Sequence, residues 1–129
     1  MRIEHVALWS PDIERLKQYY ERYFGATASL RYENPAKRFQ SYFLSFDSGA
    51  RLELMQHPDL ARGHSDPGTK TSGYAHLAVS VGSEARVSEF TERLRAAGYS
   101  VIDGPRRTGD GYFESVVLDP DGNRIELTV

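Results

Sequence analysis

His76-Leu77-Ala78-Val79 and Arg124-Ile125-Glu126-Leu127 are the two stretches that decide the fold, because an earlier part of the chain repeats both of them. His5-Val6-Ala7-Leu8 matches the first stretch, and Arg51-Leu52-Glu53-Leu54 matches the second. The separation between His5 and Glu53 along the chain is nearly equal to that between His76 and Glu126. A duplication of this length predicts two copies of one structural unit, with equivalent residues related by a pseudo-two-fold axis.

The first copy has the pattern of a strand, a helix and three further strands. Ser10 is the expected N-cap of the helix, with Pro11 as its first residue, and apolar residues then recur at helical spacing until Gly25, the expected C-terminal glycine. The expected strands of this copy cover residues 3–9, 27–32, 40–46 and 50–56.

The second copy repeats this order. Ser83 is the expected N-cap of a helix that ends at Gly98, with core positions at Val87, Phe90, Leu94 and Ala97. Strands are expected over residues 74–81, 99–102, 113–118 and 124–129, with a turn at 119–122. The predicted fold class is α+β, a single domain of residues 1–129 made of two βαβββ modules (1–57 and 74–129) with a linker over 58–73.

Composition narrows the class of protein. Hydrophobic residues make up 40% of the 129 residues, the formal net charge is −2 with both signs interspersed, and there is no cysteine. A globular core is therefore expected. The balanced charge argues against nucleic acid or an anionic membrane as the main binding partner. The lack of cysteine excludes disulfides and thiolate metal sites. Met1 leads directly into a charged, strand-like segment, so we expect no targeting leader, no membrane span and a cytoplasmic location.

His5, Glu53, His76 and Glu126 occupy matching places in the two copies. A lone histidine or glutamate at such a place is usually structural, but four at equivalent positions predict one convergent site. Strand alternation puts each glutamate on the sheet face opposite its apolar neighbours, where an unpaired carboxylate would be costly. Two imidazoles and two carboxylates suit a divalent first-row metal ion.

The same four residues resemble the His-Glu-His-Glu metal ligands of glyoxalase I, in the vicinal oxygen chelate superfamily. This superfamily also includes ring-cleaving dioxygenases, an epimerase, fosfomycin thiol transferases and bleomycin-binding proteins. The segment 119–126 is similar to the superfamily's C-terminal signature, and 19–25 resembles the end of its first helix. The resemblance covers essentially the whole chain and implies the glyoxalase/bleomycin resistance/dioxygenase fold with a metal-lined cleft.

The resemblance implies a lyase or isomerase that acts on a small hydroxy-carbonyl or hemithioacetal substrate through an enediolate, as in lactoylglutathione lyase. Glu126 would move the proton, with Glu53 as the alternative, and the cofactor would be one divalent ion: nickel, cobalt or zinc, with iron or manganese as further options. A ring-cleaving dioxygenase, an epimerase and a metal-independent ligand-binding resistance module remain open. The resemblance to small members of the glyoxalase I branch implies that the modules pair across a homodimer, with a monomer that pairs its own modules as the alternative.

The expected substrate contacts differ from those of glyoxalase I. Trp9 stands where the resemblance implies an arginine for the glutathione carboxylate, and His57 falls near a family asparagine. Trp9 and Phe113 are the aromatics expected to line the cavity. Arg106 and Arg107, in a segment 104–111 that resembles the family's flexible lid, are candidates for anionic substrate groups or for a solvated hairpin. His57 and His64, in and beside the linker, have no partner in the duplicated pattern.

Overall fold

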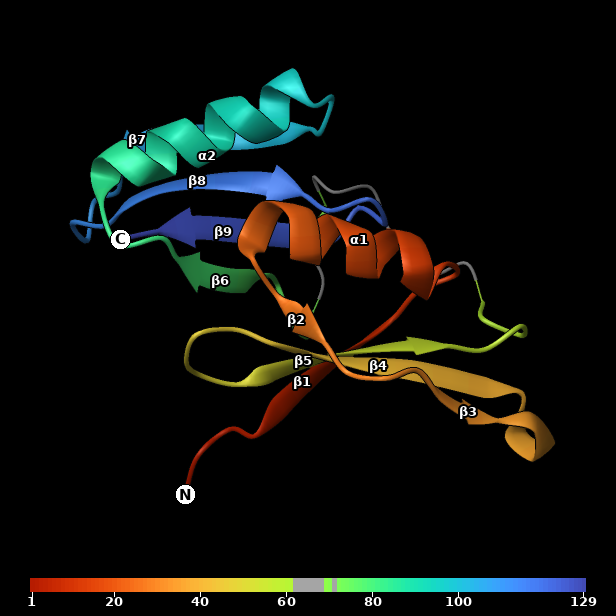
Figure 1. The fold of residues 1–129 in the computed structure, drawn as a ribbon. Coiled ribbons are helices and arrows are strands. Elements are labelled where there is room, and N and C mark those ends of the chain that lie inside the picture. The colour runs from red at the N-terminus through yellow and green to blue at the C-terminus, as the bar shows by residue number, and fades with distance from the viewer. Residues whose placement is uncertain (62–68, 71) are drawn as a thin grey trace. The chain divides into compact units, whose positions relative to one another are not determined.

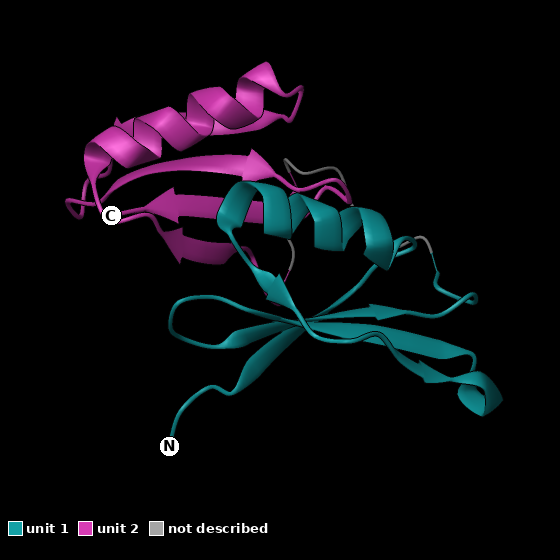
Figure 2. Cartoon of the chain, in the orientation of Figure 1, with its two compact units in different colours: residues 1–63 teal, residues 64–129 magenta. Residues whose placement is uncertain are grey.

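The computed structural model describes residues 1–61, 69–70 and 72–129, and it divides into two compact units, residues 1–63 and 64–129 (Figure 2). The boundary falls inside the predicted linker, and residues 62–68 and 71 of that linker lie outside the described part of the chain, as does His64. Each unit combines one long helix with one mixed sheet, so the predicted α+β class with two βαβββ modules is confirmed (Figure 1).

The first unit runs β1 (His5–Trp9), α1 (Ile13–Phe24), β2 (Thr27–Ala28), β3 (Tyr32–Asn34), η1 (Pro35–Lys37), β4 (Phe39–Ser45) and β5 (Arg51–Gln56). Its five-stranded sheet has the order β1-β5-β4-β2, with β3 also paired to β4. The β1 and β5 strands are parallel, and the other pairs are antiparallel. The first and last strands of the unit are therefore neighbours.

The second unit runs β6 (Leu77–Ser80), α2 (Glu84–Ala96), β7 (Val101–Arg107), β8 (Phe113–Leu118) and β9 (Arg124–Thr128). Its four-stranded sheet has the order β6-β9-β8-β7, again with only the first and last strands parallel. The two units therefore share one topology, as the duplication predicts.

Strand alternation gives each sheet a helix face and an opposite face, which we call the far face. Leu52 and Leu54 of β5 are buried against the α1 side, as are Ile125 and Leu127 of β9 against the α2 side. The residue between the two buried residues of each pair points to the far face. The packing of the helices therefore fixes which side chains the far face presents.

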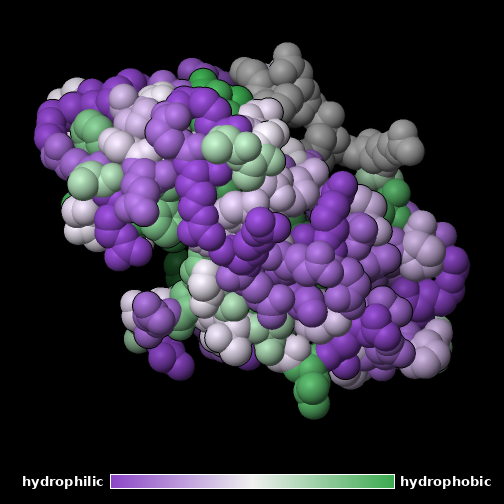
Figure 3. All heavy atoms as spheres, turned by 45° about the horizontal axis from the view of Figure 1, so that its top comes forward, coloured by the Kyte–Doolittle hydropathy of each residue, from purple (hydrophilic) through white to green (hydrophobic). Residues whose placement is uncertain are grey.

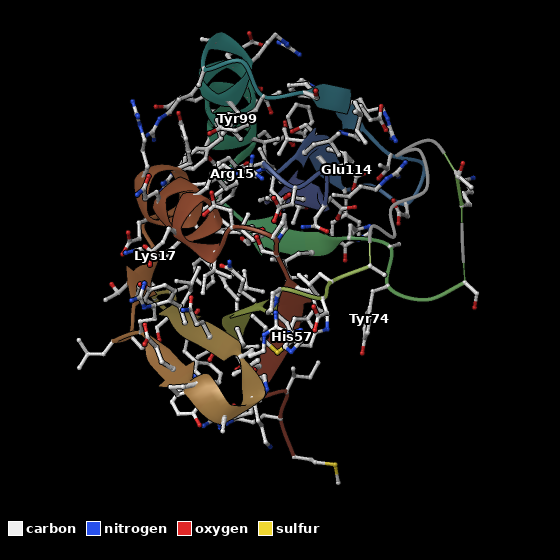
Figure 4. The ribbon with its side chains drawn as sticks, turned by 90° about the vertical axis from the view of Figure 1, so that its right-hand side faces the viewer. Arg15, Lys17, His57, Tyr74, Tyr99 and Glu114 are labelled. Atoms are coloured by element: carbon white, nitrogen blue, oxygen red, sulfur yellow. The ribbon has the colours of Figure 1, made fainter. Side chains whose placement is uncertain are left out.

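Several predicted boundaries need correction. The N-cap of α1 is Asp12, whose carboxylate accepts a hydrogen bond from the Arg15 amide, while the Ser10 hydroxyl accepts from the Asp12 amide. The predicted strand 27–32 is broken into two short strands, and β6 begins at Leu77 rather than at Tyr74, which is fully exposed (Figure 4). Ala97 is exposed rather than in the core. Ser83 and Gly25 cap their helices as predicted.

Hydrophilic side chains predominate on the face of the molecule drawn in Figure 3. Among the described residues, neither helix is long and apolar enough to cross a membrane.

Candidate metal centre

His5 and Glu53 form a pair on the far face of the first sheet. Glu53 pairs with Ala7 across the parallel β1–β5 ladder, two residues beyond His5 on the same face. The Nε2 atom of His5 lies 3.7 Å from Oε2 of Glu53. Glu53 is held in place by the burial of its neighbours Leu52 and Leu54.

His76 and Glu126 form the matching pair on the far face of the second sheet. Glu126 pairs with Ala78, two residues beyond His76, so the construction is the same in both units. The Nε2 atom of His76 lies 3.4 Å from Oε2 of Glu126. Each imidazole is 40% exposed, whereas the glutamate side chains are 15% and 19% exposed. The two pairs agree in register, spacing and burial.

The chemistry of each pair fits two ligands of one metal ion. Metal–nitrogen and metal–oxygen bonds of about 2.0–2.2 Å separate neighbouring ligand atoms by roughly 3 to 3.5 Å. The measured separations are close to that range, and a small rotation of either side chain would bring both atoms onto one ion. Within the described residues no three of His, Cys, Asp or Glu form a group that could hold a metal ion. Each unit by itself therefore offers two candidate ligands.

His5 has a second carboxylate neighbour on its other ring nitrogen. Its Nδ1 atom lies 2.5 Å from Oε2 of Glu4. Arg51 in turn donates to Oε1 of Glu4 from Nε at 2.8 Å and also from Nη2, and it stacks over the ring of Phe43. The hydrogen bond with His5, and next the one from Arg51, lower the pKa of Glu4, so this carboxylate is ionised at neutral pH. Sequence analysis missed Glu4 because its duplicated counterpart, Ala75, carries no functional group.

Glu114 is a second acidic side chain on the far face that the sequence did not single out. It lies on β8 with the same alternation as Val116, which pairs with Glu126 (Figure 4). Burial, and then the negative charge of Glu126, raise the pKa of Glu114, while the nearby Arg106 opposes this. Glu114, which lies close to Glu126, thus favours the protonated form of its own carboxyl group more than an ordinary glutamate does.

Arg106 lies on the far face beside Glu114, but two carboxylates already compensate its charge. Its guanidinium donates to both carboxylate oxygens of Asp103 and lies 3.8 Å from Glu114. Arg106 in turn lowers the pKa of Asp103. Substrate recognition by Arg106 would therefore require it to exchange partners.

Arg107 and Phe113 lie on the other side of the sheet. They pair with each other across β7 and β8, and Phe113 shares the alternation of the buried Ser115 and Val117. Arg107 forms an ion pair with Glu84 in the first turn of α2 and donates to the carbonyl of Gly111. These two residues thus lie away from the histidine–glutamate pair of their unit. The predicted loop 104–111 is also shorter than expected, because β7 continues to Arg107.

Trp9 lies on the far face of the first sheet with His5. It is 51% exposed and packs edge-to-face against Phe39, with 6.0 Å between ring centroids. Tyr32 also contacts Phe39, so three aromatic rings lie at the end of the face beyond Glu53. His57 lies after β5, where its Nδ1 accepts a hydrogen bond from the Asp59 amide.

The chain of two βαβββ units matches a known family. The chain fits the family model of the Glyoxalase/Bleomycin resistance protein/Dioxygenase superfamily over residues 2–127. The protein belongs to this superfamily.

Individual relatives are similar along most of the chain. Lactoylglutathione lyase from Haemophilus influenzae is 28% identical over 132 residues, which cover 98% of this chain and 91% of the relative. The trypanothione-dependent glyoxalase I of Leishmania major superimposes with a TM-score of 0.78 at 24% identity, covering 99% of this chain and 86% of that one. Glyoxalase I from Zea mays gives 0.79 at 24% identity and covers 98% of this chain, which spans only 44% of the maize protein. The two structural likenesses show the shared fold.

Proposed function

We propose that the protein is a metal-dependent glyoxalase-like lyase that binds one divalent ion through His5, Glu53, His76 and Glu126. The observation that carries this proposal is the repetition of one histidine–glutamate pair, at matching register and spacing, in both units. The similarity to lactoylglutathione lyase along 98% of the chain supports an enzyme of this kind. Nickel, cobalt and zinc all suit two imidazoles and two carboxylates.

Each side chain has a defined role in this proposal. A bound divalent ion supplies Lewis-acid stabilisation of charge on a substrate oxygen. Glu126 takes a proton from the substrate carbon and returns it to the neighbouring carbon, with Glu53 as the alternative base. Ala7 and Ala78, opposite the two glutamates, are small side chains that leave room next to the carboxylates.

The proposed substrate is the hemithioacetal of a 2-oxoaldehyde, which this proton transfer converts into a 2-hydroxy thioester. The exposed aromatic rings of Trp9 and Tyr32 offer apolar surface to a substituent of the substrate. This surface favours a thiol adduct with an apolar or aromatic group over a strongly anionic one.

Metal analysis followed by kinetics tests the proposal. The wild-type protein should bind one divalent ion per histidine–glutamate quartet, and His5→Ala and Glu126→Gln should each lose most of this metal while unfolding at nearly the wild-type temperature. The metal-loaded wild type should convert methylglyoxal hemithioacetals of several thiols, and Glu126→Gln should lower kcat by at least about 10²-fold. His57→Ala is the matched control, since His57 lies outside the quartet.

The proposal is wrong if both variants keep full metal content by elemental analysis. Oxygen consumption with a catechol and ferrous iron would instead identify a dioxygenase. Tight ligand binding that survives complete metal removal would identify a binding module.

A further inference from the structure

The first histidine–glutamate pair is more elaborate than the second. His5 lies between two carboxylates, with Glu4 at its Nδ1 atom and Glu53 at its Nε2 atom. Glu4 is itself fixed by two guanidinium nitrogens of Arg51, on the strand next to β1. A further backbone hydrogen bond, from the Arg51 amide to the Glu4 carbonyl at 3.0 Å, fixes the main chain at this place.

The hydrogen-bonding chemistry of these groups determines the state of the ring. An ionised carboxylate can only accept hydrogen bonds, so the contact of 2.5 Å requires the proton to be on Nδ1 of His5. In a neutral imidazole the other nitrogen then carries a lone pair. That nitrogen is Nε2, which faces Glu53 at 3.7 Å. Two acceptors that face each other at this distance are the arrangement that a cation between them would satisfy.

The second pair lacks this support from its preceding residue. The position before His76 is Ala75, and its methyl group cannot accept a hydrogen bond. His76 and Glu126 otherwise repeat the first pair in register and exposure. The two histidines therefore differ at Nδ1, because only His5 has a carboxylate from its preceding residue at that atom.

We propose that Glu4 is a positioning residue of the metal centre: its carboxylate, held by Arg51, keeps the proton of His5 on Nδ1 and directs Nε2 toward Glu53. Partners of this kind, which orient a metal-binding histidine from behind, typically contribute a factor of 10–100 to metal affinity. This inference rests on the proposed metal site. It adds Glu4 as the residue that orients His5 in the first histidine–glutamate pair. Exposure of Glu4 and His5 does not prevent this role, because the backbone and Arg51 already restrict Glu4.

Nuclear magnetic resonance of the metal-free protein tests the positioning directly. Long-range proton–nitrogen spectra distinguish the two imidazole tautomers, and the chain has only 4 histidines to assign. At a pH of about 8.5, above the ordinary imidazole pKa, wild-type His5 should carry its proton on Nδ1. In Glu4→Ala the proton should move largely to Nε2, the form that free imidazoles favour, while the signals of His76 stay unchanged.

Calorimetric titration of the metal-free proteins with Co²⁺ tests the consequence. Glu4→Ala should weaken binding by about 10–100-fold. Glu4→Gln, whose amide oxygen still accepts from Nδ1, should lie closer to the wild type than to Glu4→Ala. Glu33→Ala is the matched control, because it removes another exposed glutamate–arginine ion pair of the same unit, to Arg31, and should leave Co²⁺ affinity unchanged.

The two proposals fail in different ways. An unchanged His5 tautomer in Glu4→Ala, or an equal loss of Co²⁺ affinity in Glu33→Ala and Glu4→Ala, would overturn the positioning role. A wild-type protein that binds no Co²⁺ would overturn the proposed function, whereas a Glu4-dependent tautomer would then still support the positioning of the His5 ring.

Discussion

Trp9 shows how one residue sets the chemistry that the far face offers to a substrate. It lies four residues beyond His5 on the same side of β1, half exposed, with its indole against Phe39. The resemblance to glyoxalase I implies an arginine here that binds the glutathione carboxylate. An indole cannot form a bidentate ion pair, so this place attracts apolar groups instead of anions.

Glutathione adducts should therefore be poor substrates. Loss of one partner from a buried, hydrogen-bonded ion pair costs about 3–5 kcal/mol, and about 1.4 kcal/mol corresponds to a tenfold change. The expected loss is about two to three and a half orders of magnitude. We therefore expect kcat/KM for the glutathione–methylglyoxal hemithioacetal below about 10⁶ M⁻¹s⁻¹. Trp9→Arg should raise this value and Trp9→Phe should not. A wild-type kcat/KM above that limit would show that Trp9 does not exclude glutathione adducts.

At the scale of the elements, two irregularities in β7 set the faces on which its charged side chains lie. Its register shifts twice, between Val101 and Asp103 and again between Asp103 and Arg106, and at each shift β7 has one more residue than the facing stretch of β8. Such a bulge reverses the alternation of the strand. Arg106 therefore shares the far face with Asp103, and Arg107 turns to the helix side.

Gly104 lies in the second bulge, between Asp103 and Arg106, and its substitution should be costly. Its φ is +71°, and a Cβ atom there would lie 2.5 Å from the carbonyl oxygen of Glu114. We expect Gly104→Ala to lower the free energy of unfolding by at least about 2 kcal/mol, from the left-handed backbone and the backbone clash together. Gly109→Ala, with nothing within 4 Å of the added atom, is the control. Equal urea midpoints for the two variants would contradict this account.

The sequence predicts the duplicated part of this fold but not the irregular course of β7. The duplication predicts the two units, their topology and the matched histidine–glutamate pairs, because register follows from the buried aliphatic residues on either side of Glu53 and Glu126. The sequence predicts a loop over 104–111 where β7 continues to Arg107, and the pairing of Arg107 with Phe113 puts both on the face opposite Glu114. Glu4 has no polar counterpart in the second unit and Glu114 approaches Glu126 only across the strands, so a pattern along the chain reveals neither.

At the scale of the whole molecule, the central question is which units combine their ligands. Each unit supplies one histidine and one glutamate, and the described residues contain no group of three potential ligands. A four-ligand site therefore needs two units. We propose that they come from two chains of a homodimer, as the resemblance to small members of the glyoxalase I branch implies.

Mixing two inactive variants distinguishes a shared site from an internal one. His5→Ala and His76→Ala each remove one ligand from every site, so both homodimers should be inactive. If each site combines the first unit of one chain with the second unit of its partner, a heterodimer of the two variants has one site with all four ligands and one with two. Random exchange makes about half of the dimers heterodimers, so an equimolar mixture should regain about a quarter of the wild-type activity and metal content.

Light scattering should give a mass near twice the 14.6 kDa of one chain. A monomer by light scattering, or a dimeric mixture that stays inactive after subunit exchange has been verified, would place both units of the site in one chain.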